Sequence, residues 1–244
     1  RDAQESRGLG DVYKRQTKCF ITNSTYADIF VVFASTNRDA GVKGLSAFIV
    51  ERDRAGFSVD KHEDKMGIRT SDTASLVFDN VRIPADHLLG KEGEGFKYAM
   101  QTLDLARPFV AASAVGLAQR AVDEAVKYAK ERICFGKPIA KFQAISFMLA
   151  DMATEIEAAR QLVYSTAVRK DAGDPESAKL CAMSKLYAAE MCNRAAYKAV
   201  QIHGGYGYIK EYKVERFYRD ARITSIYEGT SQVQQMVISG SLLK

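Results

Sequence analysis

Short apolar runs alternate with polar turns along the first part of the chain, at a spacing of roughly ten residues. This pattern predicts strands, because no segment between the runs has helical periodicity. The strands are expected at Lys18–Asn23, Asp28–Thr36, Leu45–Glu51, Phe57–Asp60 and Ala74–Asp79. The second of these runs is apolar enough to be covered on both faces. Successive strands without intervening helices indicate an antiparallel sandwich or barrel.

After Gly93 the apolar residues recur at helical spacing, which predicts long helices that share a core. Gly136–Pro138 and Ala172–Pro175 break the pattern, and a further short helix is expected near Thr230–Ser241. The three predicted apolar faces contain Val110, Ala114, Leu117, Ala121, Ala125 and Tyr128, then Ile145, Met148, Met152, Ile156, Ala159 and Val163, and finally Leu180, Met183, Tyr187 and Met191.

Strands followed by helices predict an α+β chain with an all-β part and an antiparallel helical bundle. We place the boundary near Gly90–Gly95, which gives a β domain over residues 17–93 and a helical domain over residues 94–244. Residues 1–16 are polar and have no clear period, so they fit neither part.

Composition adds that the chain is a folded globular protein, since 47% of its residues are hydrophobic and 27% are charged. Membrane insertion is not expected, because no apolar run approaches the ~18 residues that a spanning helix needs. The net charge of +5 is mild. Without a block of basic residues it does not favour a nucleic-acid partner, but a modest positive field suits a phosphorylated small ligand.

The cysteines predict neither a metal site nor a disulfide framework, because no two of them are two residues apart and no histidine has a finger-like offset. We expect buried free thiols in a reducing compartment, at Cys19, Cys134, Cys181 and Cys192.

Two stretches combine glycine or arginine with aromatic residues. Ile202–Tyr208 (IHGGYGY) has three glycines in four positions, which allow close approach of the backbone to another group, although a turn in a bundle also explains them. Arg132–Gln143 (RICFGKPIAKFQ) crowds an arginine and aromatic side chains at a corner between helices. Arginine suits a phosphate and an aromatic ring suits a planar ligand, whereas the alternative is a cation at a helix C-terminus.

Two further stretches contain carboxylates. Glu228 lies before a glycine in Tyr227–Gln232 (YEGTSQ), where Thr230 is expected to cap the next helix. The alternative for Glu228 is a solvated loop acid. Asp104–Pro108 (DLARP) holds an acid and an arginine within a helical region, and the alternative there is a solvated ion pair.

Taken together, these segments resemble the acyl-CoA dehydrogenase family from about Thr17 to Lys244, and most closely its short- to medium-chain, butyryl-type group. The motifs that carry the resemblance are KCFITN at Lys18–Asn23, KMGIRTSDT at Lys65–Thr73, FDNVRIP at Phe78–Pro84, LLGKEGEGF at Leu88–Phe96, RICFGKPIAKFQ at Arg132–Gln143, QIHGGYGY at Gln201–Tyr208 and YRDARITSIYEGTSQ at Tyr218–Gln232.

The resemblance implies an FAD enzyme that oxidises an acyl-CoA of butyryl to octanoyl length to the trans-2-enoyl-CoA and passes electrons to an electron-transferring flavoprotein. It also implies a homotetramer, in the cytoplasm of a bacterium or in the mitochondrial matrix. The fold it implies here is the remnant of an antiparallel β-barrel or sandwich domain, followed by an all-α four-helix bundle. Two other interpretations stay open, an acyl-CoA oxidase that uses oxygen and a catalytically inert, oligomerising fragment.

Glu228 resembles the catalytic base, which removes the pro-R α-proton while the β-hydride moves to flavin N5. The backbone N–H of the base is a donor to the thioester oxygen, and Gly229 allows this backbone to lie close to the substrate. Asp104 and Arg107 match the pair that contacts the acyl-CoA. In other branches of the family the base precedes that arginine, but here the position holds Ala106, which cannot take a proton.

The cofactor contacts implied by the resemblance fall in both parts of the chain. Phe20 and Thr22 resemble the pair beside the flavin ring, with Phe20 in place of the usual tryptophan. Contacts to the diphosphate and adenosine of a neighbouring subunit's FAD are implied for Arg132, Phe135, Phe142, Gln143, Gln201, Gly204 and Gly205. Thr230 and Gln232 match the cofactor contacts that follow the base.

Compared with the family pattern, the chain is expected to lack the N-terminal helical domain and the first part of the β domain. Residues 1–16 match nothing in the family, so we expect a spurious junction there. Because half of the flavin pocket would then be missing, the chain alone is expected to bind FAD weakly.

Overall fold

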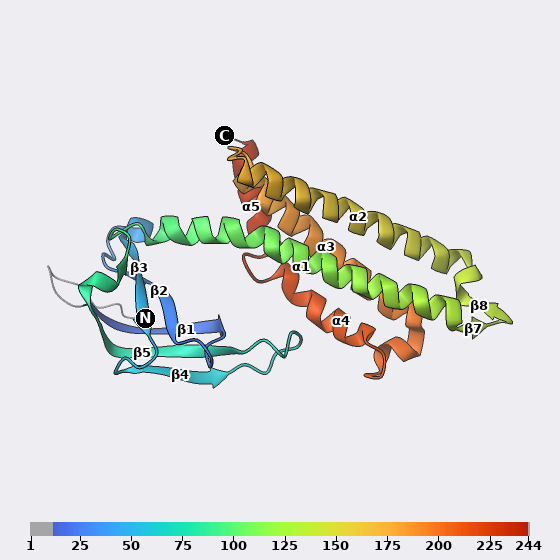
Figure 1. Cartoon of the computed structure of the whole chain (residues 1–244), viewed down its shortest axis with the longest axis horizontal. Helices are drawn as coiled ribbons and strands as arrows, with labels where there is room; N and C mark the ends of the chain where they lie inside the picture. Colours follow the sequence, from blue (N-terminus) through green and yellow to red (C-terminus); the bar gives the residue numbers. More distant parts are fainter. Residues whose placement is uncertain (1–11, 244) are drawn as a thin grey trace. The chain divides into compact units, whose positions relative to one another are not determined.

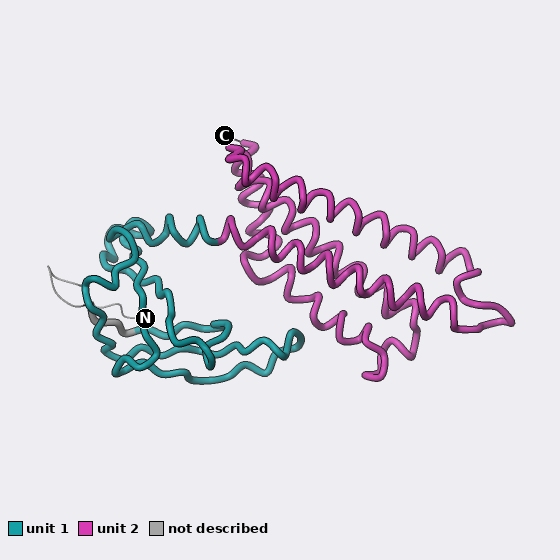
Figure 2. Tube along the Cα trace, viewed as in Figure 1, with its two compact units in different colours: residues 1–102 teal, residues 103–244 magenta. Residues whose placement is uncertain are grey.

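The computed structural model describes residues 12–243, and the chain divides into two compact units, residues 1–102 and 103–244 (Figure 2). The prediction for residues 1–16 therefore falls mostly outside the described residues. The division at residue 102 lies within a long helix, whereas the predicted boundary near Gly90–Gly95 comes just before it. The domain limits 17–93 and 94–244 stay a prediction.

The first unit contains two antiparallel three-stranded sheets (Figure 1). One sheet has the order β1-β5-β4, built from Val12–Thr22, Thr73–Ile83 and Phe57–His62. The other has the order β2-β3-β6, built from Ile29–Ser35, Leu45–Glu51 and Leu88–Leu89. Strand β1 begins earlier than predicted, since Val12 already pairs with Ile83 of β5. Among the described residues no sheet closes into a barrel.

Apolar side chains from both sheets form one cluster, which makes the arrangement sandwich-like. Phe57 on β4 links them, because its ring lies 4.9 Å from the ring of Phe30 on β2 and 5.2 Å from that of Phe78 on β5. The buried members of the cluster are Phe30, Val32, Phe48, Val50, Leu76, Phe78, Val81 and Ile83.

The prediction that the second strand is covered on both faces is wrong for the described residues. Along β2 the side chains alternate between buried and open positions. Phe30 and Val32 are buried, whereas Ile29 and Val31 are more than half exposed. An antiparallel strand needs only one covered face, and an unbroken apolar run does not show which faces are covered.

The second unit is helical apart from a short hairpin, and α1 enters it from the first unit (Figure 1). The long helices are α1 (Gly95–Glu131), α2 (Gln143–Asp171) and α3 (Ser177–His203). Two shorter helices follow, α4 (Val214–Ala221) and α5 (Ser231–Leu242). The hairpin of β7 (Ile133–Cys134) and β8 (Lys137–Pro138) joins α1 to α2. Strands followed by a helical bundle confirm the expected α+β class.

The core of the bundle is rich in alanine, which allows helices to pack closely. Fully buried alanines recur at helical spacing along α1, at positions 111, 114, 118, 121 and 125. The predicted face of α2 is also buried from Met152 to Val163. Alanine makes up about half of the buried residues of this core, so small side chains account for much of the helix packing.

Two details of the helical prediction are wrong. On α3, Met183 and Tyr187 lie on the exposed side, and the buried face is made instead by smaller residues such as Cys181, Ala188 and Ala195. In addition, the sequence pattern did not predict α4, although Val214 and Phe217 are buried at helical spacing. Ranking residues by hydrophobicity alone misplaces the core where small residues form it.

Candidate functional site

Glu228 lies in the loop between η5 (Arg222–Ser225) and α5, and its backbone conformation is unusual. Its φ angle is 54°, in the left-handed region that glutamate rarely adopts. Its side chain is half-buried, which differs from a fully solvated loop acid. Gly229 follows with a φ of 89°. Thr230 Oγ1 then accepts a hydrogen bond of 3.3 Å from the N–H of Val233, which confirms Thr230 as the N-cap of α5.

Two fully buried polar side chains bind the backbone of this loop, and sequence reasoning missed both. Lys185 Nζ, from α3, donates to the carbonyl of Gly229 at 2.7 Å. Gln234 Nε2, from α5, donates to the carbonyls of Gly229 at 2.9 Å and Glu228 at 3.2 Å. Burial lowers the pKa of Lys185 to about 8, although Glu190 and Glu228 favour its charged form. Lysine and glutamine usually lie at the surface, so no sequence pattern marks them as buried.

Asp104 and Arg107 form an ion pair on α1, with 2.6 Å between Arg107 Nη1 and Asp104 Oδ1. The alternative of a solvated pair is wrong, because Arg107 is only 4% exposed. Arg107 Nε is also buried, and no described residue is its hydrogen-bond partner. The pair therefore places a guanidinium with unused donor capacity inside the bundle.

A large cavity of about 610 Å³ lies at the end of the bundle where α1, the β7–β8 hairpin and η4 (Gly204–Tyr208) meet. It brings the RICFGKPIAKFQ and QIHGGYGY segments together, as the resemblance implies. The predicted residues that line it are Arg132, Phe135, Phe142, Gly204 and Gly205. Phe135 at the hairpin tip is 95% exposed, and its φ angle of 50° is left-handed.

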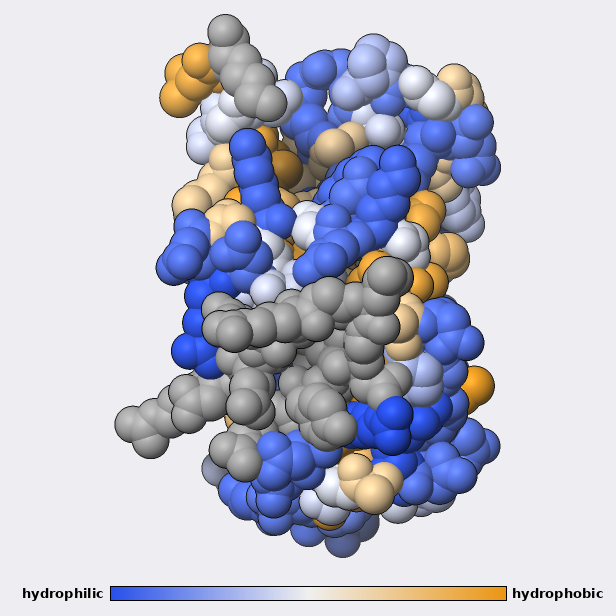
Figure 3. Space-filling model, turned by 90° about the vertical axis from the view of Figure 1, so that its left-hand side faces the viewer, coloured by the Kyte–Doolittle hydropathy of each residue, from blue (hydrophilic) through white to orange (hydrophobic). Residues whose placement is uncertain are grey.

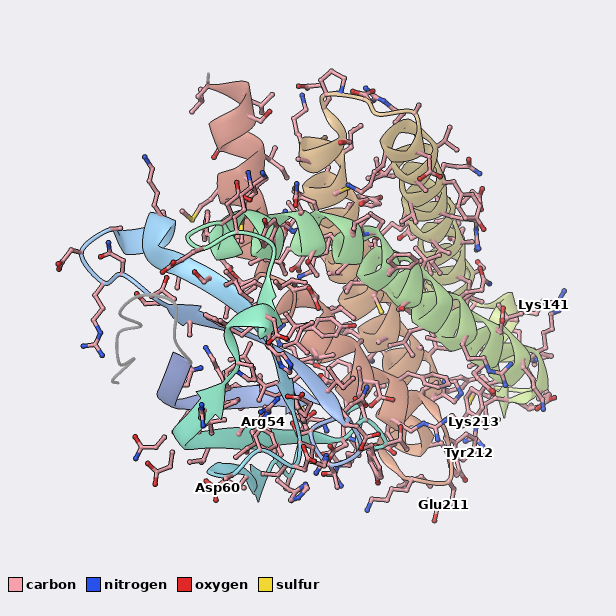
Figure 4. All side chains as sticks on the ribbon, turned by 60° about the vertical axis from the view of Figure 1, so that its left-hand side comes forward. Arg54, Asp60, Lys141, Glu211, Tyr212 and Lys213 are labelled. Atoms are coloured by element: carbon pink, nitrogen blue, oxygen red, sulfur yellow. The ribbon has the colours of Figure 1, made fainter. Side chains whose placement is uncertain are left out.

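Aromatic rings at this cavity include Tyr128, His203 and Tyr206, which the sequence did not single out as cofactor contacts. Tyr128 stacks on the buried His203 at 4.2 Å between ring centroids, and Tyr212 (Figure 4) meets Tyr128 edge on at 5.8 Å. Burial raises the pKa of Tyr128 and lowers the pKa of His203. The guanidinium of Arg132 lies 5.3 Å from the ring centroid of Tyr206. The cavity thus combines flat apolar walls with one cation.

A second, more polar cavity of about 550 Å³ lies beside the start of α5. Thr230 and Gln232 line it, as do residues that the sequence did not single out, including Asn193 and Arg222. Ser231 donates a hydrogen bond of 2.5 Å to Glu190 Oε1 and so ties α5 to α3 at the cavity wall. Hydrogen-bonding groups therefore surround the predicted cofactor contacts that follow Glu228.

Some of the candidate residues line neither cavity. Gln143 at the start of α2 and Gln201 near the end of α3 are exposed and line neither cavity. Phe20 and Thr22 belong to the first unit, at the end of β1. Phe20 is 73% exposed and has a φ of 57° beside an irregularity in the pairing of β1 with β5.

The thiols differ in burial. Cys181 and Cys192 are buried, Cys134 is half-buried, and the expectation of a buried thiol is wrong at Cys19, which is exposed on β1. Within residues 12–243, no group of three or more His, Cys, Asp or Glu side chains could hold a metal ion.

No helix of the described part is both long enough and apolar enough to cross a membrane. On the face shown in Figure 3, hydrophilic residues dominate and hydrophobic ones occur in small groups.

Two family models match the chain. The model described as acyl-CoA dehydrogenase, middle domain, covers residues 8–81, and the model described as acyl-CoA dehydrogenase, C-terminal domain, covers residues 93–243. The chain therefore belongs to the acyl-CoA dehydrogenase family, and the resemblance seen in the sequence is confirmed. The first match begins inside the segment 1–16.

Individual relatives agree with this assignment. The chain is 53% identical over 237 residues to the caffeyl-CoA reductase-Etf complex subunit CarC of Acetobacterium woodii, covering 97% of this chain and 62% of that protein. It is also 53% identical to a short-chain specific acyl-CoA dehydrogenase of Megasphaera elsdenii, covering 93% of this chain and 59% of the relative. The solved structure of butyryl-CoA dehydrogenase from Megasphaera elsdenii matches with a TM-score of 0.95 and 51% identity, covering 98% of this chain and 62% of that one. The chain thus spans about three fifths of these relatives' length.

Proposed function

We propose that the protein is an FAD-dependent acyl-CoA dehydrogenase that converts a short- to medium-chain acyl-CoA to the trans-2-enoyl-CoA. Its membership of the family and the names of its relatives support this function. The observation that carries the proposal is the strained, half-buried position of Glu228. A glutamate held at positive φ beside a glycine is the kind of local strain that concentrates at functional sites.

Glu228 acts as the general base and takes the proton from Cα of the acyl group, so its carboxylate becomes a carboxylic acid. When bound, FAD supplies the acceptor for the hydride that leaves Cβ. The backbone N–H of Glu228 is the donor that we assign to the thioester oxygen, where negative charge develops. No described residue accepts a hydrogen bond from this N–H.

The large cavity at the end of the bundle fits the adenosine diphosphate part of a neighbouring subunit's FAD. Arg132 supplies a cation for the diphosphate, and aromatic rings supply walls for the adenine. A Cβ atom added to Gly204 or Gly205 would meet nothing within 4 Å, so the glycine backbone borders open space in which a ligand can approach. Phe20 and Thr22 are assigned to the flavin ring, and Thr230 and Gln232 to further contacts in the polar cavity. We assign the neighbouring subunit's FAD to Gln143 and Gln201 on the strength of the family alone.

Replacing Arg132 with methionine is expected to weaken FAD binding by about 10- to 100-fold, because a charge-assisted hydrogen bond to the diphosphate is lost. Titration of the apoprotein with FAD measures the change. Lys141→Met is the matched control, since Lys141 is exposed and points away from the ribbon near the same hairpin (Figure 4). An unchanged FAD affinity in Arg132→Met would remove this residue from the cofactor contacts.

The partners of the proposed enzyme are an acyl-CoA, an electron-transferring flavoprotein and further copies of the chain in a homotetramer. A relative named as a subunit of an Etf complex supports the electron acceptor. Asp104 and Arg107 are assigned to the acyl-CoA within the bundle. The bacterial cytoplasm or the mitochondrial matrix is the proposed location, and a relative from Bos taurus is named as mitochondrial.

The choice of electron acceptor separates this function from that of an oxidase. Relatives at 51–53% identity are named as dehydrogenases or reductases, so oxygen is not the favoured acceptor. Butyryl-CoA is expected to bleach the flavin, and the reduced enzyme is expected to pass electrons to an electron-transferring flavoprotein with little hydrogen peroxide formed in air. Peroxide formation at the rate of substrate turnover would point to an acyl-CoA oxidase instead.

A further inference from the structure

The backbone carbonyls of Glu228 and Gly229 accept hydrogen bonds from side chains of α3 and α5. The Gly229 carbonyl accepts from Lys185 Nζ at 2.7 Å and from Gln234 Nε2 at 2.9 Å, and the Glu228 carbonyl accepts from Gln234 Nε2 at 3.2 Å. Both donor side chains have an exposed fraction of 0%. These bonds hold the backbone of the residue whose carboxylate is assigned as the base.

The fit of the loop on these donors is close. A Cβ atom at Gly229 would lie 2.7 Å from Gln234 Nε2, so only glycine allows the amide to approach the chain here. The φ angles of 54° and 89° at Glu228 and Gly229 are both in the left-handed region. Such a conformation persists only where the surroundings fix it, and the hydrogen bonds from Lys185 and Gln234 are positioned to do so.

We propose that Lys185 and Gln234 are positioning residues that fix the Glu228–Gly229 backbone and thereby aim the Glu228 carboxylate at the acyl α-carbon. This inference rests on the function proposed above. It adds two side chains that do not touch the reacting atoms but determine where the base lies.

The stability of the bundle does not require an ammonium at this position. A buried charge is unfavourable, and methionine would fill much the same space without that penalty. The charged groups that act on Lys185 are Glu190 on its own helix, Arg107 on α1 and Glu228 in the loop. If Lys185 is removed, the Gly229 carbonyl still has Gln234 as a donor, so no buried acceptor is left without a partner. The loss of Lys185 is therefore expected to change the direction of the Glu228 carboxylate more than the stability of the fold.

The test compares Lys185→Met and Gln234→Met with the control Lys198→Met, which lies on the same helix and pairs with Asp151 and Glu155 instead. In the FAD-loaded enzyme, both test variants are expected to lower kcat for butyryl-CoA by about 10- to 100-fold, because a misdirected base reacts slowly. KM is expected to stay within about twofold, since the substrate contacts remain. The control is expected to match the wild type.

Amide hydrogen exchange gives a measurement on the chain that does not depend on activity. Residues 226–232 are expected to exchange faster in both test variants than in the wild type and the control, because the loop has lost a hydrogen bond to the core. Unchanged exchange in this segment, or faster exchange with unchanged kcat, would overturn the positioning role. If the wild type itself does not oxidise acyl-CoA, the proposed function fails, and the exchange result alone then decides whether the two side chains fix the loop.

The pH dependence of unfolding gives a second check on Lys185. Its pKa is about 8 in the folded chain, against 10.5 for an ordinary exposed lysine, so between these values the unfolded chain binds a proton that the folded chain lacks. In that window Lys185 makes stability rise with pH, and Lys185→Met is expected to lose this contribution. Identical pH profiles for wild type and variant would contradict the burial of the Lys185 ammonium beside the Gly229 carbonyl.

Discussion

Replacing Glu228 with glutamine is expected to lower the rate at which butyryl-CoA reduces the flavin by about 10²- to 10⁴-fold, the range that a general base contributes. Glutamine keeps the shape of the side chain but cannot accept the α-proton. The backbone of residue 228 and its hydrogen bond from Gln234 do not involve the carboxylate, so FAD binding and folding should be retained. Stopped-flow absorbance of the flavin measures the effect.

Glu211→Gln serves as the control for this variant. Glu211 is an exposed carboxylate that projects from the loop before α4, so its loss should leave the rate unchanged (Figure 4). Normal bleaching of the flavin by butyryl-CoA in Glu228→Gln would show that another group takes the proton, and the assignment of Glu228 would then fail.

Replacing Asp104 with alanine is expected to lower the free energy of unfolding by about 3 kcal/mol, a typical loss when one partner of a buried ion pair is removed. The guanidinium of Arg107 is 4% exposed, and its Nε already has no partner among residues 12–243. Without the carboxylate, the positive charge stays buried with no counter-ion bonded to it. Denaturant unfolding followed by circular dichroism gives the free energy.

The control is Glu157→Ala, which breaks a pair of the same i, i+3 spacing on α2. The Glu157 side chain is 57% exposed and its bond to Arg160 is 3.0 Å long, so a loss of about 0–1 kcal/mol is expected. Equal losses in the two variants would mean that water reaches Arg107 and that the pair on α1 behaves like a surface pair.

The sequence predicted well those features that depend on local pattern. Leu45–Glu51 forms a strand with the predicted limits, because an apolar run between turn residues leaves little choice of ends. The predicted break at Ala172–Pro175 separates α2 from α3 as expected, and Thr230 caps α5. In each case the signal lies within a few residues, and local backbone chemistry decides the result.

Features that depend on distant partners were not predictable. The ammonium of Lys185 is buried because a carbonyl 44 residues further along the chain accepts its hydrogen bond. His203 is buried because it stacks on Tyr128 of another helix. A pattern of polar and apolar residues assigns such side chains to the surface, and only the packing of helices reveals where they lie. The family resemblance identified Glu228 but not Lys185 and Gln234, which bind the backbone of its loop.

The left-handed backbone at residue 228 also bears on how this family could change over time. Asparagine or glycine would suit that conformation better than glutamate, by roughly 1 kcal/mol. Selection for stability alone would therefore favour replacement of glutamate at this position. The proposed role of Glu228 as the base accounts for a glutamate at this less stable position. Relatives that have lost that role are then expected to carry asparagine or glycine at the position of residue 228.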